Sequence, residues 1–385
     1  MKKFVKIIFV IISIICLALF SFSSGYDAHN ISSLAYVIAI GLDSGTNSPL
    51  KLSIQLTKPT IESGTQKATN IVNSVECSSI ESGMDLFNSY ISRILNLSQC
   101  KVIVISEELA KTGIGKYISD LNDNSEVSPH ANIIISKCSA EDFLNSSEPA
   151  LEDLPSKYYD LSMTSNTYNG YTKNISLIDF FSYYYDTFSE PIATLGSINS
   201  KDDKQKLEIM GITVFKKDKL VGELNSLETI CHMIISNDLN TCKLQVPNPF
   251  DNSSSIDLEV RLNKNTKNKV YFVNNTPYIK CDVNLQVKVL SLGQNLLSDN
   301  SSYYTDENVK ILEDTFSQYF SEQISNYLYK VCKEYNCDID SFGKYAVKYF
   351  PTTKDWLDYN WLDNFENSFF EVNVKTYIKS GYTFF

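Results

Sequence analysis

Histidine is the side chain that most often binds metals or transfers protons near neutral pH. The chain has three histidines: His29, His130 and His232. None lies four residues from another, so the H-E-x-x-H pattern of zinc-dependent hydrolases is absent. His232 follows Cys231 in a short amphipathic stretch. We interpret this pair as packing residues, with a metal site as the alternative.

Residues 112–117, TGIGKY, carry part of a phosphate-binding loop. The first glycine of that motif is missing, and Tyr117 stands where Ser or Thr must bind magnesium. We therefore predict a helix interrupted by glycine. The adjacent carboxylates Asp202 and Asp203 lie in a polar stretch and are interpreted as solvated side chains.

Residues 120–126, DLNDNSE, place carboxylate and amide side chains at alternate positions, as calcium loops do. Ser125 replaces the glycine of the sharp turn, and Ala131 stands at the position of the bidentate glutamate. A capped helix end is the simpler interpretation. A G-x-S-x-G nucleophile elbow is also absent from the sequence.

Cysteine is the remaining reactive residue type. One of the nine lies in the apolar N-terminal run and eight follow it: Cys16, then Cys77, Cys100, Cys138, Cys231, Cys242, Cys281, Cys332 and Cys337. Their scattered spacing favours buried or free thiols over a disulfide framework. A local bridge between the close pair Cys332 and Cys337 stays open. We predict no catalytic residue, no metal ligand, no cofactor and no enzymatic activity, and keep a secreted enzyme as a competing hypothesis.

The N-terminus has the pattern of an export signal. Lys2, Lys3 and Lys6 precede the apolar run Ile7–Phe20, and small residues follow at 21 and 23–25. We expect residues 1–24 to be a signal or membrane-anchor segment. The stretch 4–22 at about 1.5 Å per residue gives about 28 Å, which just spans a hydrocarbon core of about 30 Å.

Composition excludes several classes of function. The chain has 385 residues, 43% of them hydrophobic, which suits folded domains. Its formal net charge is −11 and no Lys/Arg-rich stripe occurs, so a nucleic-acid partner is not expected.

Hydrophobic patterning predicts how the elements alternate. Strands are expected at 35–42, 50–57, 101–106, 131–136, 211–215, 219–224, 255–262, 269–273, 278–290 and 371–379, and helices at 78–95, 107–121, 139 onward, 176–187, 226 onward and 306–334, followed by two short helices on either side of Pro351. Residues 58–76 are expected to be an exposed polar loop leading to a weak strand, and residues 146–172 a surface excursion. The predicted fold is multi-domain α+β, with mixed or antiparallel sheets each flanked by helices.

Two polar stretches, 196–206 and 245–255, divide this pattern. We predict an N-terminal α/β domain at 26–195, a small middle hairpin-helix domain at 205–245 and a C-terminal α+β domain at 253–385.

Five segments in register resemble the Ger(x)C family of spore germination proteins. They are LAYVIAIGLD (34–43), CKVIVISEELAKTGI (100–114), LPSKYYDL with NISLIDFF (154–161 and 174–181), GITVFKKDKLVGEL (211–224), and DIDSFGKYAVKYFPTTKDW (338–356) with Trp361 and FEVNVKTYIKSG (370–381). The fourth is the most specific, and the resemblance runs from about residue 26 to the end.

The resemblance implies the C subunit of a nutrient germinant receptor. It implies A and B receptor subunits as partners, no catalytic residue, and a place on the outer face of the spore inner membrane. A stand-alone exported solute-binding protein is the alternative. The chain departs from the family at Gly25, where the lipid-bearing cysteine is expected, so an uncleaved peptide anchor is predicted in place of the lipid.

Overall fold

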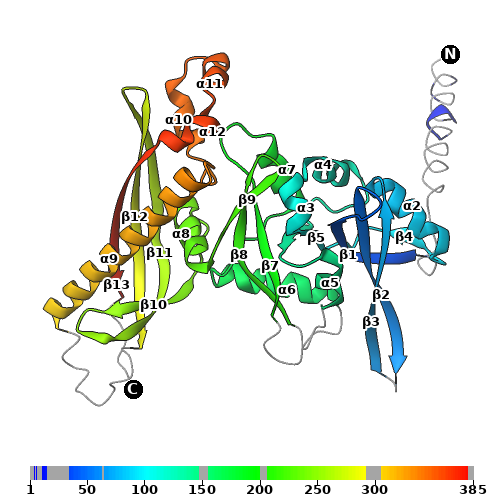
Figure 1. Ribbon diagram of the computed structural model, residues 1–385, viewed down its shortest axis with the longest axis horizontal. Helices are drawn as coiled ribbons and strands as arrows, with labels where there is room; N and C mark the ends of the chain where they lie inside the picture. The colour runs from blue at the N-terminus through cyan, green and yellow to red at the C-terminus, as the bar shows by residue number, and fades with distance from the viewer. Residues whose placement is uncertain are drawn as a thin grey trace.

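The structure, a computed structural model, describes residues 34–62, 65–146, 155–199, 206–291 and 305–379, with residues 4, 6 and 11–14 near the N-terminus. Figure 1 shows a large sheet and a smaller sheet side by side, each with helices packed on it. The predicted α+β class with mixed sheets is therefore confirmed.

The large sheet has nine strands in the order β3-β2-β1-β5-β6-β7-β8-β9, with β4 paired to β1. These strands are β1 (Leu34–Ser44), β2 (Leu50–Glu62), β3 (Thr65–Cys77), β4 (Ile94–Asn96), β5 (Val102–Ser106), β6 (Asn132–Ser136), β7 (Ile192–Asn199), β8 (Lys206–Lys216) and β9 (Lys219–Leu224). The central strands β1, β5, β6 and β7 are parallel, and both ends of the sheet are antiparallel hairpins.

Two separate cores explain why the central strands are apolar on both faces. In β5, Ile103 and Ile105 pack in the larger core, whereas Val102 and Val104 pack in the smaller one. Strands covered on both faces read as continuous apolar runs. The smaller core includes side chains of α5 (Ala140–Asn145) and α6 (Pro155–Tyr168). The larger core includes side chains of four helices: α2 (Ile80–Tyr90), α3 (Glu107–Thr112), α4 (Gly115–Asp123) and α7 (Leu177–Tyr184).

The small sheet has the order β10-β11-β12-β13. Its strands are β10 (Cys242–Asn248), β11 (Asp251–Val273), β12 (Thr276–Ser291) and β13 (Phe369–Ile378), with β13 parallel to β12. The predicted alternation of β12 is confirmed, since every second residue from Ile279 to Val289 is buried. Helix α8 (Ser226–Ser236) and the long α9 (Asp306–Tyr329) cover this buried face.

Several predicted elements have different bounds. Where a polar loop leading to a weak strand was expected, β2 continues to Glu62 and β3 spans Thr65–Cys77. Residues 155–168, expected in a surface excursion, form α6. The glycine interruption expected in 112–117 is confirmed, since α3 and α4 part at Gly113, whereas the helix expected at 78–95 ends at Tyr90 before β4. Strand β7 was not predicted.

The C-terminal half shows similar shifts. The second polar stretch, 245–255, belongs to the β10–β11 hairpin. Helix α9 continues as a π-helical turn, η3 (Lys330–Glu334), followed by α10 (Gly343–Ala346), α11 (Thr353–Tyr359) and α12 (Trp361–Asn364). The π-turn preserves the predicted helical span to residue 334.

The predicted N-terminal anchor lies outside the described residues, apart from 4, 6 and 11–14. Within the part of the chain that the structure describes, no helix is long and apolar enough to cross a membrane. Gly25, His29, Asp202 and Asp203 also lie outside the described residues.

Candidate functional site

The most distinctive motif of the sequence, 211–224, forms the hairpin β8–β9 at the edge of the large sheet. Gly211 has φ +89°, and a Cβ there would lie 2.5 Å from the carbonyl oxygen of Leu224. Only glycine adopts this conformation without strain. The first glycine of the motif therefore lets β9 approach β8 closely at Leu224.

The turn of this hairpin contacts the N-terminal half. Asp218 accepts hydrogen bonds at the start of α4: its backbone oxygen from Ile114 N at 3.0 Å and its Oδ2 from Gly115 N at 3.2 Å. Lys217 N donates to Glu190 Oε2 at 2.7 Å. Glu190 is 3% exposed, and burial raises the pKa of its carboxyl group.

The outer edge of the same hairpin contacts the C-terminal half. The Tyr335 ring lies against Gly222, where a Cβ would overlap it. The Tyr335 hydroxyl donates to the Glu223 carbonyl at 3.0 Å, and Lys330 Nζ approaches the same oxygen at 3.3 Å. Lys330 also bonds both carboxylate oxygens of Glu228 at 2.8 and 3.0 Å. The exposed carbonyl of an edge strand is thus satisfied by side chains from η3 and the turn after it.

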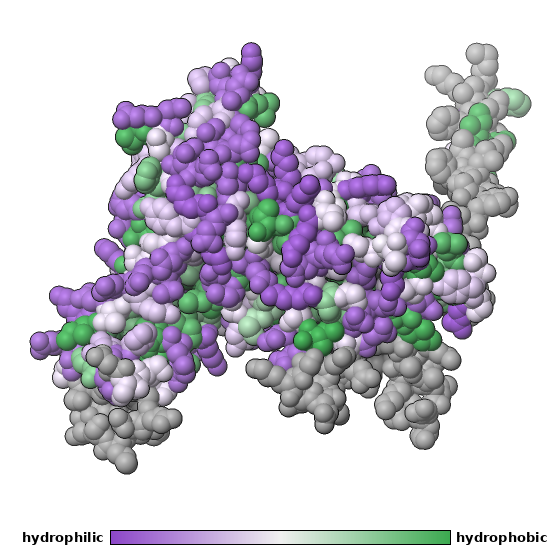
Figure 2. Space-filling model, viewed as in Figure 1, coloured by the Kyte–Doolittle hydropathy of each residue, from purple (hydrophilic) through white to green (hydrophobic). Residues whose placement is uncertain are grey.

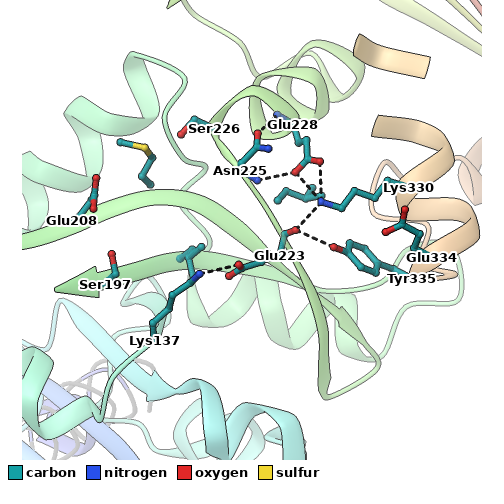
Figure 3. Close-up of a pocket in the computed structure, with 13 residues that line it drawn as sticks. Lys137, Ser197, Glu208, Glu223, Asn225, Ser226, Glu228, Lys330, Glu334 and Tyr335 are labelled. Carbon is teal, nitrogen blue, oxygen red and sulfur yellow. Dashed lines mark hydrogen bonds and ion pairs between the residues drawn. The ribbon is translucent and has the colours of Figure 1, made fainter. Parts of the chain in front are cut away.

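These contacts line a pocket of about 660 Å³, shown in Figure 3. Lys137 bonds Glu223 across it at 2.8 Å, and Glu208 and Glu334 carry further carboxylates at its wall. Four glutamates and two lysines face this space, so its balance is acidic. We use the name junction for two sets of contacts. Lys217 and Asp218 contact the N-terminal half, and Gly222, Glu223 and Glu228 contact Lys330 and Tyr335.

A buried polar network lies one helical turn beyond the junction residue Glu228, around His232 of α8. Lys173 Nζ lies 3.1 Å from His232 Nε2, and because lysine only donates, that nitrogen must accept. The proton of His232 therefore sits on Nδ1, which donates to Asp340 Oδ1 at 2.9 Å. The Tyr327 hydroxyl donates to Asp340 Oδ2 at 2.7 Å, and Lys173 pairs with Asp238 at 2.6 Å.

Electrostatics keep His232 neutral. Burial lowers its pKa, Lys173 adds to that effect, and Asp340 opposes it. A His–Asp pair occurs in hydrolase triads, where the other ring nitrogen faces a nucleophilic hydroxyl. Here it faces an ammonium group, and the His232 side chain is 1% exposed. The arrangement ties together α8, α9 and the loop before α10, and offers no nucleophile to a substrate.

Asp338 anchors the loop between η3 and α10. Its carboxylate accepts from Trp361 Nε1 at 2.7 Å and from the backbone nitrogens of Gly343, Phe342 and Asp340 at 2.8, 3.1 and 3.2 Å. Burial raises the pKa of Asp338 to about 7, although these donors oppose that rise. The Asp338 backbone oxygen accepts from Glu190 N at 2.8 Å, so this loop also joins the two halves.

The residues considered for chemistry do not converge. Gly113 separates α3 from α4, Asn124 caps the end of α4, and His130 is exposed. Cys332 and Cys337 are both buried free thiols, and burial raises the pKa of Cys332 to about 11. Among the described residues, no group of three His, Cys, Asp or Glu side chains could hold a metal ion.

Sequence reasoning missed the partners that give the motif its role. Tyr335, Lys330 and Asp340 lie a hundred residues from the groups they contact, and no local pattern marks them. A glycine inside the short strand β9 was the available signal, because an interior strand glycine often marks the close approach of another group.

The fold and the junction define a two-sheet α+β protein that is organised around contacts between its halves. Two family models match it: the spore germination protein N-terminal domain over residues 27–198, and the spore germination B3/GerAC-like C-terminal domain over residues 210–381. The chain belongs to this family of spore germination proteins.

Individual relatives agree. YfkR of Bacillus subtilis (strain 168), assigned to spore germination, is 21% identical over 79% of this chain and 76% of its own length. The spore germination protein GerQC of Bacillus cereus is 20% identical over 75% of this chain and 77% of its own length. The crystal structure of the GerBC protein matches with a TM-score of 0.50 at 15% identity, covering 88% of this chain and 96% of that one, so the fold is shared.

Proposed function

We propose that this chain is the C-type subunit of a nutrient germinant receptor, acting through contacts with A- and B-type subunits and not through catalysis. One observation carries the proposal: the two family models match both halves of the chain in order, over residues 27–198 and 210–381. The junction supports it, because its polar groups hold the two halves together.

We place the body on the outer face of the spore inner membrane, held by the N-terminal segment. The apolar run 7–20 and its basic flank support retention of that segment, and Gly25 argues against a lipid at the usual position. Mass spectrometry of membrane-extracted protein tests this. An intact N-terminal peptide is expected. A mature N-terminus at Ser24 in the soluble fraction, or a diacylglyceryl adduct on Cys16, would overturn it.

A deletion strain tests the receptor role. Spores without this gene, and without any paralogue, should lose germination in response to at least one nutrient. Reintroducing the wild-type gene should restore that response. Unchanged germination in every nutrient tested would refute the role in nutrient detection.

A further inference from the structure

An exposed apolar patch lies on α2 and β4, at the end of the molecule remote from the small sheet (Figure 1). Leu86 and Tyr90 stand one turn apart on α2 and are 45% and 55% exposed. Ile94, four residues later in β4, is 45% exposed. Figure 2 shows hydrophobic side chains on the surface of this end.

The acidic side of α2 faces elsewhere. Glu81, Asp85 and Asn88 line a groove between α2 and α4 together with Asp120 and Asp123 of α4. Leu86 and Tyr90 are not part of that groove, whereas Ile94 also lines it. The exposed Arg93 lies between Tyr90 and Ile94 and approaches the Leu34 carbonyl at 3.5 Å. The apolar patch thus has a cationic residue beside it, and the carboxylates lie in the groove that borders the patch at Ile94.

The patch adjoins the point where the chain continues toward its apolar N-terminal run. Strand β4 pairs with the first residues of β1, with Ile94 opposite Leu34. Residues 23–33, SSGYDAHNISS, separate Leu34 from that run. Eleven residues span at most about 40 Å when fully extended, so a membrane that holds the apolar run lies within reach of the patch.

We propose that Leu86, Tyr90, Arg93 and Ile94 rest on the lipid surface to which the N-terminal segment attaches. The linking residues 23–33 are mostly polar and supply little apolar surface to cover the patch themselves. Tyrosine and arginine suit the interface, because each has an apolar body and a polar end. This inference rests on the membrane placement proposed above and adds an orientation: the large sheet lies near the bilayer and the small sheet points away.

Depth-dependent fluorescence quenching tests the orientation on the full-length chain. The Tyr90→Trp and Ile94→Trp proteins are reconstituted into phosphatidylcholine vesicles with or without brominated acyl chains. The control is Tyr377→Trp on β13, whose native side chain is 45% exposed at the other end of the molecule. The native Trp356 and Trp361 are 3% and 1% exposed and provide a constant background.

We expect the vesicle-bound Tyr90→Trp and Ile94→Trp proteins to fluoresce less on brominated than on non-brominated lipid. The Tyr377→Trp protein should fluoresce equally on both. Equal quenching of all three, quenching of Tyr377→Trp alone, or no quenching in vesicle-bound protein would overturn it. Failure of the wild-type chain to float with vesicles would do so too. None of these results depends on receptor partners, so the receptor role fails or survives separately.

Discussion

At the scale of single residues, Gly222 shows why the 211–224 motif needs its second glycine. Its glycines and charged turn were visible in the sequence, but the reason for the second glycine is the Tyr335 ring, supplied by a distant segment. Sequence alone predicted the hairpin and could not predict this contact, because nothing local records which side chain packs on a strand edge.

Substituting Gly222→Ala should destabilise the protein by about 1–3 kcal/mol, because the added methyl group overlaps the Tyr335 ring and overpacking costs that much. Urea unfolding measures the change. The control Val221→Ala changes a neighbouring exposed side chain in the same strand and should have little effect. Adding Tyr335→Ala should relieve the overlap, so additive losses in the double variant would contradict this explanation.

His232 predicts a pH dependence of stability. The folded state lowers its pKa, whereas an unfolded histidine titrates near 6.5. Its contribution to the free energy of unfolding is therefore present above about pH 6.5 and is lost as the pH falls below that value. His232→Gln should flatten the pH slope between about 5 and 7 by up to about 1.4 kcal/mol per pH unit, relative to wild type.

The exposed His130→Gln variant is the matched control for this measurement and should keep the wild-type slope. Identical slopes for His232→Gln and wild type would show that His232 already takes up its proton in the folded protein.

At the scale of elements, the sequence predicted those helices that have a local capping signal or a one-sided apolar pattern. The helices expected at 176–187 and 306–334 are both present: Ser176 and Asp179 form a capping box at the start of α7, and the buried residues of α9 recur at helical spacing. The hairpin arm of β2 and β3 was predicted only as a weak strand after a loop, because residues 58–70 are mostly polar and give no one-sided alternation. Helix α6 was missed because apolar residues gather on no single face of it.

Replacing Ser176→Ala should cost about 0.5–2 kcal/mol of stability, because the Asp179 backbone nitrogen loses its acceptor at 3.3 Å. Thermal or urea unfolding measures this loss. Ser182→Ala, at an exposed position in the same helix, should stay close to wild type. Equal effects of the two changes would mean that the cap does not stabilise α7.

At the scale of the whole molecule, the division into 26–195, 205–245 and 253–385 stays a prediction. The pairing of β7 with β8 crosses the first proposed boundary, and the junction binds the middle segment to both neighbours. We expect trypsin to cleave after Lys201 or Lys204 in the polar stretch between β7 and β8. The two fragments of the cleaved chain should still co-elute in gel filtration. Fragments that separate would contradict the view that the junction holds the middle segment to its neighbours.

We propose that this chain works as a receptor subunit and not alone. The most direct test is affinity purification of a tagged full-length chain from membranes of dormant spores after mild crosslinking, with mass spectrometry of what is captured. We predict recovery of A- and B-type receptor subunits from the wild-type strain, and their absence from an untagged strain. Quantitative recovery of the tagged chain without either subunit would contradict the central claim.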